Sequence, residues 1–154
     1  MDIADLISPV AVIPNLRVTS KKQVLQELAR RAAELCGLRE RLVFDVLLER
    51  ERLGTTGVGS GIAIPHGKIP GLERLYGVFA RLERPVNFES IDEQPVDLIF
   101  LLLAPETAGA DHLKALARVS RLLRDKGTCE KLRGTDNAEA LYALLTESPA
   151  SRAA

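Results

Sequence analysis

The sequence predicts an α/β fold in which a mixed β-sheet has helices packed on both faces. Segments whose apolar residues recur at helical spacing alternate along the chain with short runs rich in β-forming residues. One such run, Val96 to Leu103, is almost continuously apolar, as expected for a central strand buried on both faces. The order of elements is less regular than a repeated β-α-β winding, which favours a mixed sheet.

Two long helices are expected before the middle of the chain. Ser20 and Gln23 have the S-x-x-Q spacing of a capping box at a helix start. Apolar residues then recur at helical spacing, namely Leu25, Leu28, Ala32 and Leu35, until Gly37 ends the run. A second helix is predicted over Arg39 to Leu53, with Gly54 as its stop.

The remaining elements follow from shorter patterns. A glycine-rich loop over Gly54 to Gly61 leads into a strand, Ile62 to Ile64, that ends at Pro65. Asp111 is predicted to cap a third long helix. The other predicted elements are a strand over Leu75 to Leu82, the central strand over Val96 to Leu103, and helices over His112 to Arg124, Thr128 to Arg133 and Ala138 to Thr146.

Length and composition indicate one globular domain. The chain has 154 residues, of which 46% are hydrophobic and 27% charged. We expect the domain to span residues 1–147 and residues 148–154, which are small and polar, to form a flexible tail. Lys and Arg number 21, as do Asp and Glu, and aromatic residues are only 4%. This composition argues against a nucleic-acid-binding surface that works by positive charge or base stacking.

The location and redox state also follow from simple features. The acidic start, Met1 to Asp5, is no signal peptide, and the longest apolar run is far shorter than the roughly 20 residues that a membrane helix needs. We therefore expect a cytoplasmic protein without membrane insertion. Two cysteines, Cys36 and Cys129, are too few for a disulfide framework and are expected to be buried free thiols.

The glycine-rich loop and the histidine that follows it are the candidate site. Three glycines, Gly57, Gly59 and Gly61, would let the backbone approach an anion closely, and Thr55, Thr56 and Ser60 would add hydroxyl donors. His66 stands between Pro65 and Gly67. The glycines match neither common nucleotide-binding pattern. From these residues alone, a glycine turn beside an incidental histidine is an equally good interpretation.

Two further residues have unusual positions. Arg50 lies on a helical stripe with Val43, Val46 and Leu53, so it either extends to solvent or points into a site. His112 lies in the first turn of a predicted helix, on its inward stripe, where the helix dipole favours an anion. The alternative for His112 is a histidine packed at the edge of the core.

Three segments resemble the enzyme IIA domains of the bacterial phosphoenolpyruvate-dependent phosphotransferase system, of the fructose and mannitol class. They are ERERLGTTGVGSGIAIPHGK at 49–68, IDEQPVDLIF at 91–100 and DHLKALARVS at 111–120. The resemblance covers nearly the whole chain and is strongest to the small stand-alone proteins of the nitrogen-related branch. It implies the fructose/mannitol-type IIA fold for this chain.

The resemblance also implies a function for the candidate residues. His66 would accept a phosphoryl group from an HPr-type phosphocarrier, Arg50 would bind the phosphoryl oxygens, and His112 would support the reaction. No metal or organic cofactor is implied. The expected role is a regulatory phosphocarrier whose protein partners depend on phosphorylation, with potassium transporters and sensor kinases as examples of targets in this branch.

Other functions and assemblies stay open at this point. A sugar-transport component would pass the phosphoryl group to a fructose- or mannitol-specific IIB domain. A zinc-binding domain would use His66, His112 and a cysteine, although the spacing of these residues matches no common zinc motif. The sequence allows a homodimer but does not specify one.

Overall fold

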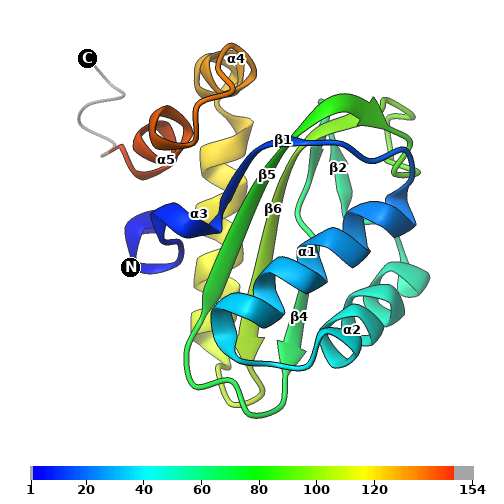
Figure 1. The fold of residues 1–154 in the computed structure, drawn as a ribbon, viewed down its shortest axis with the longest axis vertical. Helices are drawn as coiled ribbons and strands as arrows, with labels where there is room; N and C mark the ends of the chain where they lie inside the picture. The colour runs from blue at the N-terminus through cyan, green and yellow to red at the C-terminus, as the bar shows by residue number, and fades with distance from the viewer. Residues whose placement is uncertain (1, 148–154) are drawn as a thin grey trace.

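The computed structural model describes residues 2–147, and its centre is a six-stranded mixed sheet (Figure 1). The strands are β1 (Val12–Leu16), β2 (Gly57–Gly59), β3 (Ile62–Ala63), β4 (His66–Ile69), β5 (Tyr76–Val86) and β6 (Val96–Pro105). The helices are α1 (Lys21–Cys36), α2 (Glu40–Leu53), α3 (Ala110–Arg124), α4 (Lys126–Arg133) and α5 (Ala138–Thr146), preceded by two 3₁₀ turns, Ile3–Asp5 and Pro9–Ala11.

Strand β6 is the centre of the sheet, and nearly every residue in it is buried. It pairs antiparallel with β5 on one edge and parallel with both β3 and β4 on the other. Strand β1 extends the sheet beyond β5 in a parallel pairing, and β2 extends it beyond β3 in an antiparallel pairing. The sheet therefore has both parallel and antiparallel neighbours, as predicted.

Helices cover both faces of this sheet (Figure 1). Helices α1 and α2 lie over one face, and α3 lies behind the other, with α5 beside β1. The predicted fold class, a mixed sheet with helices on both faces, is confirmed. The continuous hydrophobic core includes the fully buried rings of Phe79, Phe88 and Phe100.

The long helices begin and end close to the predicted residues. The Ser20 hydroxyl accepts a hydrogen bond from Gln23 N, and Gly37 ends α1 in a left-handed conformation with φ of 68°. The capping box differs in one bond, because the Gln23 side chain accepts from Thr19 N rather than from Ser20 N. Helix α2 begins one residue after Arg39, which is its cap residue.

Several elements differ from the predictions. Strands β1 and β4 were not predicted, because both are short and mix polar with apolar residues. The predicted loop over Gly54 to Gly61 contains strand β2, which forms a hairpin with β3. Helix α3 begins at Ala110 with Gly109 as its cap residue, so Asp111 lies in the first turn and is not the cap.

Three further predictions concern the termini and the cysteines. The predicted tail, residues 148–154, lies outside the described residues. Within residues 2–147, no helix combines the length and the apolarity that crossing a membrane requires. Cys36 and Cys129 are both free thiols, but only Cys129 is fully buried, since Cys36 lies near the end of α1 and is partly exposed.

The cap of α1 gives a test of local stability. Ser20→Ala removes the hydroxyl that satisfies Gln23 N and should lower the free energy of unfolding by about 1 kcal/mol. Ser8→Ala is the control, because Ser8 precedes a 3₁₀ turn without making a side-chain cap bond. Urea denaturation of both variants measures the difference. Equal losses of stability would show that the Ser20 bond contributes nothing.

Candidate functional site

The site is built on a strand that is interrupted at Ile64 and Pro65. Strands β3 and β4 pair with β6 in one common register, so they are two parts of the same extended segment. Pro65 lies between them and has no N–H to donate to the sheet, although its carbonyl accepts from Leu102 N at 2.9 Å. The interruption places His66 at the first position of β4, on an edge of the sheet that β2 does not cover.

One hydrogen bond fixes the orientation of the His66 ring. Ile64 N donates to Thr56 O at 3.0 Å, but the chain before Thr56 turns away into α2, so the Ile64 carbonyl faces the open edge. This carbonyl lies 2.8 Å from Nδ1 of His66. Because a carbonyl only accepts, Nδ1 must carry the proton, and Nε2 of the neutral ring has a free lone pair.

His66 and His112 lie together, on the face of the sheet that α3 covers. The ring centroids are 5.8 Å apart and the ring planes are inclined by 50°. His66 is partly exposed, whereas His112 is buried in the first turn of α3 with 9% of its surface exposed. Two imidazoles from segments far apart in the sequence therefore meet at a helix N-terminus, a position that favours an anion.

The environment of His112 favours its neutral form. Burial lowers the pKa of His112, and electrostatic repulsion from His66 and Lys68 lowers it further. Nδ1 of His112 is buried without a hydrogen-bond partner among residues 2–147. Nε2 is therefore the nitrogen of His112 that would form a hydrogen bond with a bound group.

Arg50 lies in the last turn of α2, the helix that packs against β4. Side chains alternate along β4, so Gly67 faces α2 while His66 faces α3. A Cβ on Gly67 would lie 2.6 Å from Val46 Cγ1, which explains the glycine at this position. Arg50 is one helical turn beyond Val46, toward the end of α2 that leads to Thr56. Its guanidinium donates to the Gly54 carbonyl at 2.9 Å.

The hydroxyls of Thr55 and Thr56 are used within the scaffold. Thr55 Oγ1 donates to Phe88 O at 2.7 Å, and Thr56 Oγ1 donates to the Glu51 carboxylate. Each hydroxyl has a single proton, so neither has a donor left for an anion in this conformation. This differs from the expectation that both hydroxyls would bind a phosphoryl group. The difference arises because the Phe88 carbonyl and the Glu51 carboxylate, behind the loop, already accept their protons.

The three glycines of the loop allow close packing rather than access to His66. A Cβ on Gly57 would lie 2.2 Å from Ser90 Oγ, and one on Gly61 would lie 2.5 Å from an Arg133 nitrogen. Gly59, Ser60 and Gly61 all have positive φ and form the tip of the hairpin. His66 is four residues beyond Ile62, which in an extended chain corresponds to roughly 13 Å. The tip therefore lies away from the imidazole, unlike the predicted phosphoryl-binding loop.

Glu51 is an organising residue that the pattern analysis missed. Its buried carboxylate accepts from Thr56 N at 3.1 Å and forms an ion pair with Lys21 Nζ at 2.6 Å. Lys21 also lies 5.0 Å from the centroid of the Phe88 ring. The available signal was an acidic residue in the last turn of a helix, where the dipole disfavours negative charge unless a partner compensates.

The cysteines lie apart from the paired histidines. Cys129 donates to Leu123 O at 3.2 Å, near the far end of α3, and Cys36 ends α1. In the part of the chain that the structure describes, no three His, Cys, Asp or Glu residues are grouped so that they could hold a metal ion.

Comparisons with known proteins agree with this architecture. Residues 5–148 match the family model for the phosphoenolpyruvate-dependent sugar phosphotransferase system, EIIA 2. A nitrogen regulatory protein of Bradyrhizobium diazoefficiens is 63% identical over 153 residues, which cover 99% of this chain and 100% of the relative.

Solved structures show the same fold. The nitrogen regulatory protein IIA-Ntr of Neisseria meningitidis has a TM-score of 0.89 at 36% identity, covering 94% of this chain and 99% of that one. Enzyme IIA mannitol from Escherichia coli, solved in complex with phosphorylated enzyme IIB mannitol, has a TM-score of 0.77 at 18% identity, covering 93% and 100%. A family model that spans almost the entire chain, together with these relatives, places the protein in the EIIA type 2 family of the phosphotransferase system.

Proposed function

We propose that this IIA protein is a regulatory phosphocarrier that accepts a phosphoryl group on Nε2 of His66. The proposal rests above all on the bond between His66 Nδ1 and the Ile64 carbonyl. That bond holds the ring in the tautomer whose Nε2 is a nucleophile, and it orients this nitrogen.

The donor is an HPr-type carrier that bears a phosphohistidine. In the transfer, the lone pair of His66 Nε2 forms the new N–P bond as the N–P bond of the carrier breaks. The electron pair of the broken bond returns to the nitrogen of the carrier. The proton on His66 Nδ1 stays in place, and the Ile64 carbonyl stabilises the positive character that the ring acquires.

His112 and Arg50 supply the surroundings of the transferred group. His112 lies 5.8 Å from His66 between ring centroids, so its ring is close enough to donate a hydrogen bond to a phosphoryl group on His66. Arg50 donates one bond to the Gly54 carbonyl at the end of α2 and has further guanidinium protons that would bind the other oxygens. Such preorganised donors stabilise the negative charge on the equatorial oxygens of a loose transition state. Thr55 and Thr56, together with the hairpin residues Gly57, Gly59, Ser60 and Gly61, position the strand.

The regulatory role is supported by the nitrogen regulatory proteins to which the chain is similar. Its partners would then be an HPr-type carrier in the cytoplasm and target proteins, with potassium transporters and sensor kinases as candidates. A sugar-transport role is the second candidate, because enzyme IIA mannitol shares the fold and binds phosphorylated enzyme IIB mannitol. The acceptor that takes the group from His66 distinguishes the two roles.

The phosphorylation site is tested with phosphoenolpyruvate, enzyme I and an HPr-type carrier. The wild-type protein should form an acid-labile, base-stable adduct, and NMR should place the phosphoryl group on Nε2 of His66. His66→Ala should take up none. His112→Ala is the matched control at the second ring, and it should be labelled more slowly but at the same residue. Persisting label in His66→Ala, or principal labelling of His112, would contradict the proposal.

The role of Arg50 is tested through the rate of transfer. Arg50→Ala should slow phosphorylation by about 10²–10³-fold, since it removes a charged donor. Arg50→Lys should recover only part of the rate, because lysine keeps the charge but loses the planar fork. Arg52→Ala is the control, because Arg52 lies on the same helical turn and its only ion pair among residues 2–147 is a surface contact with Glu49 at 3.9 Å. Wild-type rates in both Arg50 variants would exclude the role.

The regulatory role is tested by the partners of each form. Phosphorylation adds about −1.5 to −2 charges beside His66, which should expel a partner that packs apolar or acidic groups there. Pull-downs from lysate should recover the regulatory partners with unphosphorylated wild-type protein and with His66→Ala, and lose them after enzymatic phosphorylation. Identical partner sets for both forms, with transfer of label to a IIB cysteine, would support the transport role instead.

A further inference from the structure

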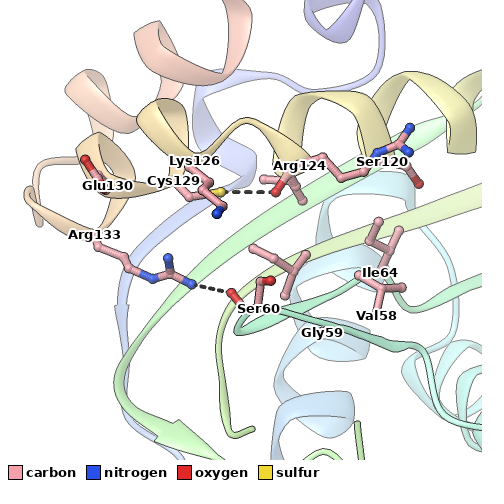
Figure 2. Close-up of a pocket in the computed structure, with 12 residues that line it drawn as sticks. Val58, Gly59, Ser60, Ile64, Ser120, Arg124, Lys126, Cys129, Glu130 and Arg133 are labelled. Carbon is pink, nitrogen blue, oxygen red and sulfur yellow. Dashed lines mark hydrogen bonds between the residues drawn. The ribbon is translucent and has the colours of Figure 1, made fainter. Parts of the chain in front are cut away.

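A cavity lies between the β2–β3 hairpin and the carboxyl-terminal helices (Figure 2). Its volume is about 660 Å³, within the range of small-molecule sites in proteins. One wall comes from the hairpin and the residues that follow it, including Val58, Ser60 and Ile64. The other comes from the end of α3 and from α4.

The cavity is separate from the paired histidines. His112 is in the first turn of α3, whereas Leu123 and Arg124, which line the cavity, end the same helix. Eleven to twelve residues of helix correspond to about 18 Å along its axis. A ligand in this cavity would therefore lie at the other end of α3 from His112, although Ile64, whose carbonyl bonds the His66 ring, also lines the cavity.

The inner part of the cavity is apolar. Ile62, Ile64 and Leu123 contribute side chains that are otherwise almost entirely buried. Cys129 also lines this part, and burial raises the pKa of its thiol, which donates to Leu123 O at 3.2 Å. The thiol is thus neutral, and these four side chains offer a surface suited to a hydrocarbon group.

The rim carries one net positive charge. Arg133 is neutralised by a two-pronged pair with Asp97 at 2.8 and 2.9 Å, and it also donates to Ser60 O at 2.9 Å. Arg124 and Lys126 are exposed on the helical side of the cavity and form no ion pair within residues 2–147 (Figure 2). Glu130 supplies one negative charge nearby. Two free cations and one carboxylate favour a monoanion over a dianion.

We propose that this cavity binds a small organic monocarboxylate with an unbranched or branched apolar body. The hydrocarbon contacts Ile62, Ile64 and Leu123, while the carboxylate lies at the rim between Arg124 and Lys126. The ligand needs both a charged head group and an apolar body, because the rim of the cavity is positively charged and its inner part is apolar.

The test uses the full chain and hexanoate as the probe, followed by amide NMR. Hexanoate should give saturable shifts centred on Ile62, Leu123 and Lys126. Acetate keeps the charge without the apolar body, and hexylamine keeps the chain with the opposite charge. Each should bind at least about tenfold more weakly. Equal responses to hexanoate and hexylamine, or hexanoate shifts spread over the whole surface, would overturn the proposal.

Variants separate the two parts of the site. The double substitution Arg124→Gln with Lys126→Gln should weaken hexanoate binding about tenfold or more while leaving the cavity in place. Arg121→Gln with Lys131→Gln is the matched control, because both residues are exposed on the same helices and do not line the cavity. Ser120→Phe should fill the cavity and abolish binding, and the paired double variants decide the question if this substitution unfolds the protein. Equal weakening by both double variants would contradict a site at the rim.

Discussion

The hydrogen bonds along one edge of β6 determine the position of everything that surrounds His66. Both β3 and β4 pair with this edge in a single register, although Pro65 interrupts the segment between them. The interruption leaves the Ile64 carbonyl at an uncovered part of the sheet, where it engages the His66 ring. Since β6 is almost entirely buried, this edge cannot move without disturbing the core. The partly exposed ring of His66 is thereby held by a strand at the centre of the core.

The fold class could be predicted from the sequence because its signals are local. The apolar run of β6, the cap at Ser20 and the stop at Gly37 each depend on neighbouring residues, and each element formed within a few residues of its predicted bounds. Strand β4 has no such signal, since His66, Gly67 and Lys68 are not β-forming residues. It forms a strand because it pairs with Leu102 to Pro105 of β6, residues that lie far from it in the sequence.

The same distinction holds for the site. His112 lies on the inward side of α3, as predicted, and packs beside His66. This position could be predicted because helical periodicity determines which side of a helix a residue occupies. The roles of the loop residues could not be predicted in this way. Glycines and threonines are equally compatible with anion binding and with close packing, and only the neighbours distinguish the two. Those neighbours, Glu51, Phe88 and Ser90, occupy the space and accept the hydrogen bonds.

The pairing of β4 with a strand that comes much later in the chain has a consequence for synthesis. As the protein leaves the ribosome, the segment that bears His66 emerges before β6, the strand on which its order depends. Until Pro105 has emerged, the imidazole is carried by unpaired backbone, and α3 with His112 follows later still. Non-local strand pairing of this kind is slow, because the chain between the two strands must close into a loop first. A nascent chain therefore displays His66 before β6 and His112 are present to surround its ring.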